Sequence, residues 1–289
     1  MTTIKQVSLT SVRFVFLFAA LGCTNTVMGD SLSDILMQQP TDTRLRYDAR
    51  HPEQTLNFFQ VKPKSTVVEV LPGGGWYSKI LLEYLGPDGL LIGADYAAEM
   101  YPKFNFYSAE YLEKKKIWAR DWTLTALDWL GNKGANVSAF AFGSMTSDID
   151  GKVDTVLMIR SLHNLARYEN DGGYMSTALA EIYRALKPGG VLGVVQHQAP
   201  ESASDAWASG DNGYLKKSFV IEALEKAGFV LEEESAINEN AADQPTESDV
   251  VWRLPPTLYT SKDNVELRER MLAIGESNRM TLRFRKPRK

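Results

Sequence analysis

The chain has 289 residues, of which 44% are hydrophobic and 24% are charged. This length suits one large α/β domain with additions better than two independent domains. The formal net charge of −4 provides no electrostatic footprint for nucleic acid, and the basic residues 283–289 are expected to form a solvated tail. We therefore expect no nucleic-acid partner.

The first thirty residues have the layout of a secretory signal peptide. A lysine and an arginine precede an apolar run at residues 14–21, and small and polar residues follow it. The run is too short to span a bilayer. We therefore expect residues 1–29 to be a signal peptide and residues 30–289 to be one exported domain; a buried N-terminal helix is the alternative. Cys23, the only cysteine, follows an imperfect lipoprotein motif, so a lipid anchor is a second alternative.

Short helices are expected before the first strand. Residues 32–37 have helical spacing, and residues 41–50 form a charged connector. Pro52 then introduces a helix at residues 52–59. The apolar, β-branched run Thr66–Val70 predicts the first strand.

A glycine-rich turn follows this strand. Gly73, Gly74 and Gly75 are consecutive, and apolar residues at helical spacing come directly after them. Glycine permits positive φ angles and close approach of the backbone to a ligand, and a helix N-terminus offers unpaired N–H groups. Two interpretations stay open: a ligand-binding turn, or an ordinary tight turn between a strand and a helix.

Strands and helices alternate through the rest of the chain. Further strands are predicted at residues 90–94, 137–142, Val153–Ile159, 191–196, 229–233 and 280–284, and helices at residues 109–130, 175–186, 217–227 and 264–275. Residues 237–263 are polar and poorly periodic, which indicates an irregular insertion. This alternation predicts an α/β fold with a doubly wound, mainly parallel sheet. Ligands of such sheets bind beyond the carboxyl ends of the strands.

An acidic residue ends the second strand. Asp95 lies twenty residues after Gly75, where a carboxylate can accept hydrogen bonds from ribose hydroxyls. The alternative is a turn or helix-capping acid. Together the turn, the acid and the sheet indicate a nucleoside site. Trp76 and Tyr77 leave poor room for a pyrophosphate, which argues against a nicotinamide dinucleotide.

Four parts of the sequence resemble a class I S-adenosylmethionine-dependent methyltransferase: E-V-L-P-G-G-G, Asp95, V-D-T-V-L-M-I-R-S-L-H-N-L and A-L-K-P-G-G-V-L. The chain is most similar to exported bacterial methyltransferase-like proteins with R-H-P, P-G-G-G-W-Y and H-N motifs. The similarity extends over residues 50–287. It implies S-adenosyl-L-methionine as the cofactor, a periplasmic location, and a Rossmann-like methyltransferase fold whose last strand is antiparallel and at the edge.

The resemblance also implies cofactor-binding residues. Glu69 and the glycines Gly73, Gly74 and Gly75 would pass the methionine end of the cofactor, Asp95 would bind the ribose hydroxyls, and Ser144 would lie near the adenine. The sequence departs from the family pattern at Leu71, where glycine is usual, and near Ser144, where an acid is common.

Methyl transfer needs positioning and, for some acceptors, a base. His163 follows the fourth strand and His197 ends the fifth, so both are candidate catalytic bases; a structural role is the alternative. His51, Tyr77 and Asn164 are candidate substrate contacts. No histidines have the local spacing of metal ligands, so no metal site is expected.

The sequence thus predicts an exported methyltransferase that acts on a small molecule or a protein side chain. The first alternative is a non-catalytic module of the same fold that binds a nucleoside-like ligand. The second is a nicotinamide oxidoreductase, against which the aromatic pair and the L-K-P-G-G turn argue.

Overall fold

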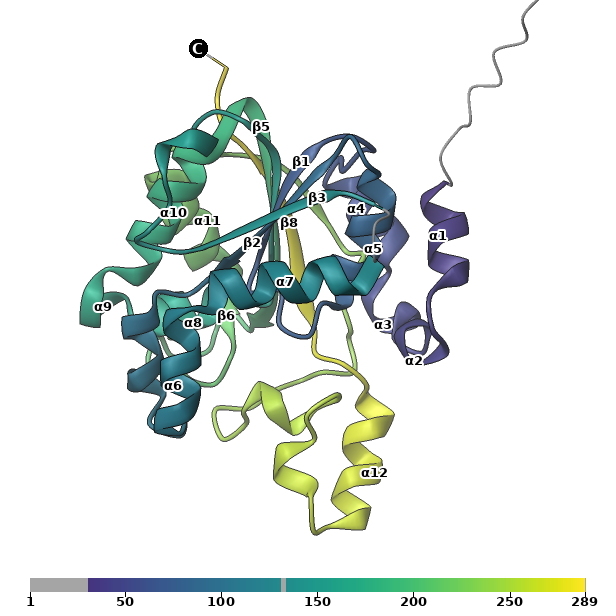
Figure 1. Ribbon diagram of the computed structural model, residues 1–289. Helices are drawn as coiled ribbons and strands as arrows, with labels where there is room; N and C mark the ends of the chain where they lie inside the picture. The colour runs from purple at the N-terminus through teal and green to yellow at the C-terminus, as the bar shows by residue number, and fades with distance from the viewer. Residues whose placement is uncertain (1–30, 131–133, 289) are drawn as a thin grey trace, which may run out of the picture.

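A computed structural model describes residues 31–130 and 134–288 (Figure 1). The proposed signal peptide and Cys23 lie outside the described residues, so export and anchoring stay predictions. Within the described part of the chain, no helix is both long and apolar enough to cross a membrane.

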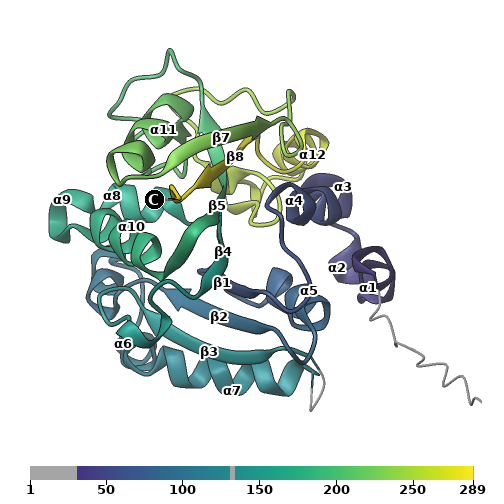
Figure 2. The ribbon, with the colours of Figure 1, turned by 90° about the horizontal axis from the view of Figure 1, so that it is seen from above.

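One mixed sheet forms the centre of the molecule. Its strands are β1 (Thr66–Val70), β2 (Leu90–Asp95), β3 (Asn136–Ala141), β4 (Val153–Ile159), β5 (Leu186–Ala199), β7 (Val230–Ser235) and β8 (Arg279–Arg285), with the short β6 (Leu215–Lys216) beside β5. The order is β3-β2-β1-β4-β5-β8-β7, which is visible from above in Figure 2. The first five strands are parallel, and β8 is antiparallel to both of its neighbours.

Helices cover both faces of the sheet. They are α1 (Leu32–Gln38), α2 (Thr41–Arg44), α3 (Tyr47–Arg50), α4 (Pro52–Phe58), α5 (Trp76–Leu85), α6 (Ala109–Lys116), α7 (Trp118–Leu130), α8 (Leu162–Arg167), α9 (Glu169–Gly172), α10 (Tyr174–Ala185), α11 (Lys217–Lys226) and α12 (Val265–Ile274). Short 3-10 helices occur at Ala98–Phe104, Ser147–Ile149, Val251–Arg253 and Tyr259–Ser261.

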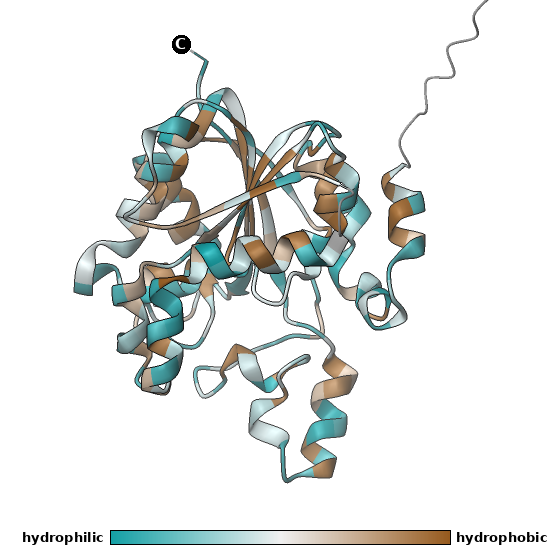
Figure 3. Cartoon of the chain, in the orientation of Figure 1, coloured by the Kyte–Doolittle hydropathy of each residue, from teal (hydrophilic) through white to brown (hydrophobic). Residues whose placement is uncertain are grey.

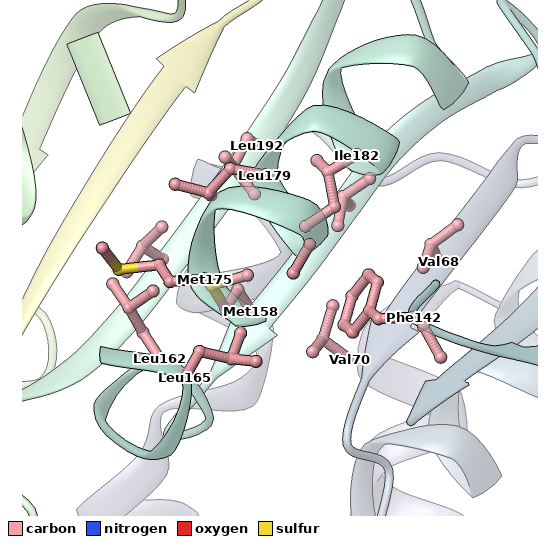
Figure 4. Close-up of a cluster of buried hydrophobic side chains, with 14 of the residues drawn as sticks. Val68, Val70, Phe142, Met158, Leu162, Leu165, Met175, Leu179, Ile182 and Leu192 are labelled. Carbon is pink, nitrogen blue, oxygen red and sulfur yellow. The ribbon is translucent and has the colours of Figure 1, made fainter. Parts of the chain in front are cut away.

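Two apolar cores result from the alternation of side chains along the buried strands. Val67 and Leu157 point to the face covered by α1, α4, α5 and α7, whereas Val68 and Met158 point to the face covered by α8, α10 and α11. Figure 4 shows the second core, in which apolar side chains of α10 pack against the strands. Because both faces are covered, only the ends of the strands are available to a ligand.

The predicted sheet is confirmed, with local corrections. The last strand is antiparallel as expected, but its position at the edge was wrong: β8 lies between β5 and β7. Residues 41–50 are not a plain connector, because they form α2 and α3. The predicted helix at residues 109–130 is broken at Ile117 into α6 and α7. The L-K-P-G-G turn belongs to β5, which carries a register shift there.

The segment between β7 and β8 stands apart from the sheet. It contains the last two 3-10 helices and α12, and it lies below the sheet in the view of Figure 1. None of the residues of α12 is buried, and its surface mixes polar and apolar residues (Figure 3). This segment contributes one wall of the cavity described next.

Candidate active site

A cavity of about 550 Å³ opens at the carboxyl ends of β1, β4 and β5. Its walls come from the glycine turn, from the residues that follow β4, from the end of β5, from α2 and α3, and from residues 251–257 and 276–277. Of the sequence-predicted site residues, it brings together Gly73, Gly74, His163, Asn164 and His197.

The three glycines of the turn differ in what they face. Gly73, at φ +56°, and Gly74 line the cavity, and a Cβ at Gly74 would meet no atom within 4 Å. Gly75, at φ +78°, is buried, and its Cβ would lie 2.2 Å from the ring of Trp129 in α7. Leu71 adopts φ +52°, the left-handed region that favours glycine.

His163 has a defined hydrogen-bonding state. The amide nitrogen of Gln196 donates to the carbonyls of Gly213 (2.9 Å) and His197 (3.3 Å), so its oxygen is left to accept. This oxygen lies 3.3 Å from Nδ1 of His163, which therefore carries the proton. Nε2 has no hydrogen-bond partner among the described residues and is left with a lone pair.

His197 lies beside His163, with 5.6 Å between the two ring centroids. Its Nδ1 is 2.6 Å from the hydroxyl oxygen of Ser277. Burial lowers the pKa of His163 to about 4 and lowers the pKa of His197 well below its usual value, with nearby cationic groups acting in the same direction. Both imidazoles are therefore neutral at pH 7, and each can accept a proton.

Three other predicted residues sit near the site without lining the cavity. His51 is at φ +41° between α3 and α4, and Tyr77 is buried in α5, where its hydroxyl donates to the carbonyl of Arg50 at 3.4 Å. The carboxylate of Glu69 accepts a hydrogen bond from Ser78 at 2.6 Å, and burial raises its pKa to about 7. Asn164 does line the cavity, and its amide lies 3.4 Å from the hydroxyl of Tyr96.

The end of β2, where the sequence predicts the ribose acceptor, is closed. Asp95 is 1% exposed and lies outside the cavity. Its Oδ1 accepts from the backbone N–H of Tyr96 (2.8 Å) and the hydroxyl of Tyr101 (2.6 Å), and its Oδ2 lies 2.7 Å from Nζ of Lys115 in α6. Ser144, also outside the cavity, is exposed and donates to the carbonyl of Ala141 at 2.6 Å.

Sequence analysis missed an arginine cluster. Arg46 and Arg50 lie 3.0 and 3.2 Å, through their Nε atoms, from Oε1 of Glu276, and Arg279 reaches Oε2 at 3.1 Å. Arg160, directly after β4, lines the same cavity. Two signals were present: Arg50 belongs to the R-H-P motif, and Arg160 stands three residues before His163.

The described residues contain no group of three or more histidine, cysteine or acidic side chains able to hold a metal ion. The polar groups of the cavity are therefore organised around arginine and histidine. Guanidinium groups bind carboxylates and phosphates, and neutral imidazoles accept protons.

Comparison with known proteins gives structural relatives only. No family model matches the sequence, and no curated protein matches it. A chain from a Haloferax volcanii complex between a methyltransferase and the Trm112 methyltransferase activator is similar over 90% of this chain and 99% of its own length, with 18% identity and a TM-score of 0.51.

Two further solved structures are similar at lower scores. A SAM-dependent methyltransferase of Aquifex aeolicus is 20% identical over 72% of this chain and 94% of its own, with a TM-score of 0.47. The 1,6-didemethyltoxoflavin-N1-methyltransferase of Burkholderia thailandensis, solved with S-adenosylhomocysteine, is 14% identical over 89% and 87%, with a TM-score of 0.45. The chain thus has the fold of the class I S-adenosylmethionine-dependent methyltransferases.

Proposed function

We propose that this chain is an S-adenosylmethionine-dependent methyltransferase whose methyl acceptor binds in the cavity at the carboxyl ends of β1, β4 and β5. One observation carries the proposal: the glycine turn and two neutral histidines line the same cavity on this fold. The acceptor is a small molecule or a protein side chain, as the sequence suggests.

The turn is suited to the methionine end of the cofactor. Gly73 and Gly74 present backbone without side chains to the cavity, and the space where a Cβ of Gly74 would lie is open. Gly75 has a different task, because its lack of a side chain lets Trp129 pack against the start of α5. When bound, the cofactor supplies an electrophilic methyl group on its sulfonium sulfur.

Asp95 is the proposed ribose acceptor, and this role requires a rearrangement. All three protein donors at its carboxylate come from Tyr96, Tyr101 and Lys115. Two ribose hydroxyls would replace the donors from Tyr101 and Lys115, which are side chains and can move. The backbone N–H of Tyr96 would keep the carboxylate in place.

His163 and His197 are the proposed bases. With the cofactor bound, the methyl group would pass from the sulfonium sulfur to the acceptor atom and leave S-adenosylhomocysteine, and the proton that the acceptor loses would pass to Nε2 of one imidazole. His163 is prepared for this step because Gln196 fixes the proton on Nδ1. Both histidines line the same cavity as the glycine turn, which supports this assignment.

A thermal-shift comparison tests the proposal. S-adenosylhomocysteine at a hundred times its dissociation constant should add about 2.7 kcal/mol of stability, which corresponds to about 5–10 °C for a domain of this size. NAD at the same concentration should produce no shift. No shift with S-adenosylmethionine or S-adenosylhomocysteine, or a shift with NAD, would contradict the proposal.

The Asp95→Asn variant shows whether the shift comes from the proposed site. The substitution should weaken binding by about 2–4 kcal/mol, because charged acceptors make the stronger hydrogen bonds. Since the substitution also leaves Lys115 without its partner, the double variant Asp95→Asn/Lys115→Met serves as the control for stability. Full affinity in both variants would remove Asp95 from the site.

A further inference from the structure

Positive charge exceeds negative charge among the side chains that line the cavity. Four cationic side chains line the cavity (Arg46, Arg50, Arg160 and Lys79), against two carboxylates (Asp42 and Glu276). Glu276 is shared, since Arg46, Arg50 and Arg279 all contact it. One carboxylate is therefore shared by three guanidinium groups. Positive charges outnumber negative charges at this partly buried site.

Arg160 makes no such contact, although the charge of Glu276 acts on it at longer range. Its guanidinium makes no hydrogen bond and no ion pair within 4 Å with any residue in the described ranges, although it lines the cavity. Its backbone is held, because its N–H donates to the carbonyl of Val195 at 2.7 Å. It also adopts φ +58°, a conformation that is costly for a residue with a side chain. Strained backbone of this kind persists at functional sites when the surrounding structure imposes it.

Arg50 offers free donors beside it. Its Nε contacts Glu276, and no described residue accepts from its two terminal nitrogens. Its guanidinium is fixed 4.5 Å over the ring of Trp76. Burial and the charge of Arg160 lower the pKa of Arg50 to about 10, and burial also lowers the pKa of Arg160. Burial is the larger cause of both shifts, and the charge of Glu276 offsets it only in part.

We propose that this cavity binds an anionic group, a carboxylate or a phosphate, between Arg160 and Arg50. The inference rests on the proposed function, because it assigns the anion to a ligand of that reaction. A planar guanidinium pairs with either group through two parallel hydrogen bonds, and the pairing is strongest where water is excluded. Because His163 and His197 line the same cavity, an acceptor held by its anionic group would present its nucleophile to the histidines.

Inorganic phosphate is the probe for the first test, in the absence of any cofactor. Titration at constant ionic strength, followed by calorimetry and by tryptophan fluorescence, should show saturable binding, since Trp76 and Trp252 line the cavity. Arg160→Gln should weaken phosphate binding by about tenfold to a hundredfold, and Arg160→Lys by less, because lysine keeps the charge but loses the planar fork.

The same experiment includes controls that separate loss of phosphate binding from loss of folding. Arg160→Gln removes no hydrogen bond, so without phosphate it should unfold no earlier than the wild type. Arg120→Gln is the matched control, because Arg120 is exposed on α7 and, among the described residues, pairs only with the adjacent Asp121. It should bind phosphate as the wild type does. Absence of phosphate binding, or equal binding by Arg160→Gln and the wild type, overturns the inference.

A second pair of titrations identifies which ligand supplies the anion. If phosphate still binds in saturating S-adenosylhomocysteine, the anion belongs to the methyl acceptor. The anion is the methionine carboxylate if two results are obtained together. S-adenosylhomocysteine should displace phosphate, and Arg160→Gln should weaken the binding of S-adenosylhomocysteine without weakening the binding of 5′-methylthioadenosine. Either result supports an anion site. A protein that binds phosphate but no S-adenosylhomocysteine would keep the anion site and refute the proposed function.

Discussion

The two halves of the sheet's carboxyl edge differ in whether their charged side chains are paired. Over β2, the carboxylate of Asp95 is buried and accepts hydrogen bonds from Tyr96, Tyr101 and Lys115. Over β4, the guanidinium of Arg160 lines an open cavity and receives no partner within the described part of the chain. A buried charge is costly unless it is paired. Under the proposed function, the arginine half could bind a ligand without breaking an existing contact, whereas the acidic half would have to rearrange first.

The comparison also separates residues that hold the site from residues that face a ligand. Gly75 and Glu69 make supporting contacts outside the cavity, since Gly75 packs on Trp129 and Glu69 accepts a hydrogen bond from Ser78, and their contact with a cofactor stays a prediction. Gly74 and His163 face the cavity. Substitutions in the two groups should therefore change different measured quantities, either stability or turnover.

The largest effect is expected on turnover. His163→Ala or His197→Ala should lower the methyl-transfer rate by about 10²–10⁴-fold, because each removes a neutral base from the cavity. The affinity for S-adenosylhomocysteine should change little. Measurement of the rate and of the dissociation constant on the same variants separates the two. If both variants bind less tightly and unfold earlier, the histidines are structural.

The glycine turn allows a matched pair of substitutions. Gly75→Ala would place a methyl group 2.2 Å from the ring of Trp129 at a positive φ, so we expect a loss of about 2–4 kcal/mol in the free energy of unfolding. Gly74→Ala meets no atom within 4 Å and should lose much less. Denaturant titration of both variants measures the difference. Equal losses would mean that Gly74 also supports the fold.

Glu69 should produce a pH dependence of stability. Its pKa is about 7 in the folded protein against 4.5 as the reference, so the folded state holds the proton more tightly. This group therefore stabilises the folded state at low pH. Its contribution to the free energy of unfolding, about 3 kcal/mol, is lost as the pH rises from about 4.5 to 7. The difference in stability between Glu69→Gln and the wild type should therefore grow over that range in favour of the variant.

His163 should produce a pH dependence of stability with the opposite sign. It is measured in the Glu69→Gln variant, which lacks the contribution of Glu69. The pKa of His163 is about 4 when folded against 6.5 as the reference, so the unfolded chain takes up a proton first as pH falls. Stability should fall by about 3 kcal/mol between pH 6.5 and pH 4. A pH-independent difference between the Glu69 variant and the wild type would contradict the assignment of Glu69.

The smallest effect is expected on ligand affinity at Asp95, whose carboxylate is buried at the end of β2. Lys115→Met removes the ammonium group that occupies Oδ2 of Asp95, so adenosine-containing ligands should bind about tenfold more tightly, about 1.4 kcal/mol. Lys114→Met is the control, because Lys114 is exposed and pairs with Glu110. Weaker binding by Lys115→Met would show that the lysine orients Asp95 for the ligand instead of competing with it.

The fold was predictable because its signals are local. Apolar β-branched runs identified the buried strands, and glycine and proline marked the turns. The position of β8 was not predictable in this way. Its insertion between β5 and β7 depends on pairing between residues about ninety positions apart, such as Val191 and Arg285, and no local pattern specifies it.

The site was predictable only in part, for a related reason. Gly73, Gly74, His163 and Asn164 follow strand ends and His197 lies near the end of β5, so the sheet brings them together. Arg46 and Arg50 look like surface charges in sequence, and their role depends on Glu276, which is more than two hundred residues away. The contact between Asp95 and Lys115 could not be foreseen either, because it requires α6 to fold back over the end of β2.

A crystal structure of the protein with saturating S-adenosylhomocysteine tests the central claim most directly. The account predicts that the methionine end of the ligand lies against Gly73 and Gly74, and that its ribose hydroxyls bond to Asp95 in place of Lys115 and Tyr101. Arg160 should either contact the ligand's carboxylate or remain available in the cavity beside it. A ligand bound elsewhere, or a bound ligand with the contact between Asp95 and Lys115 unchanged, would contradict the account.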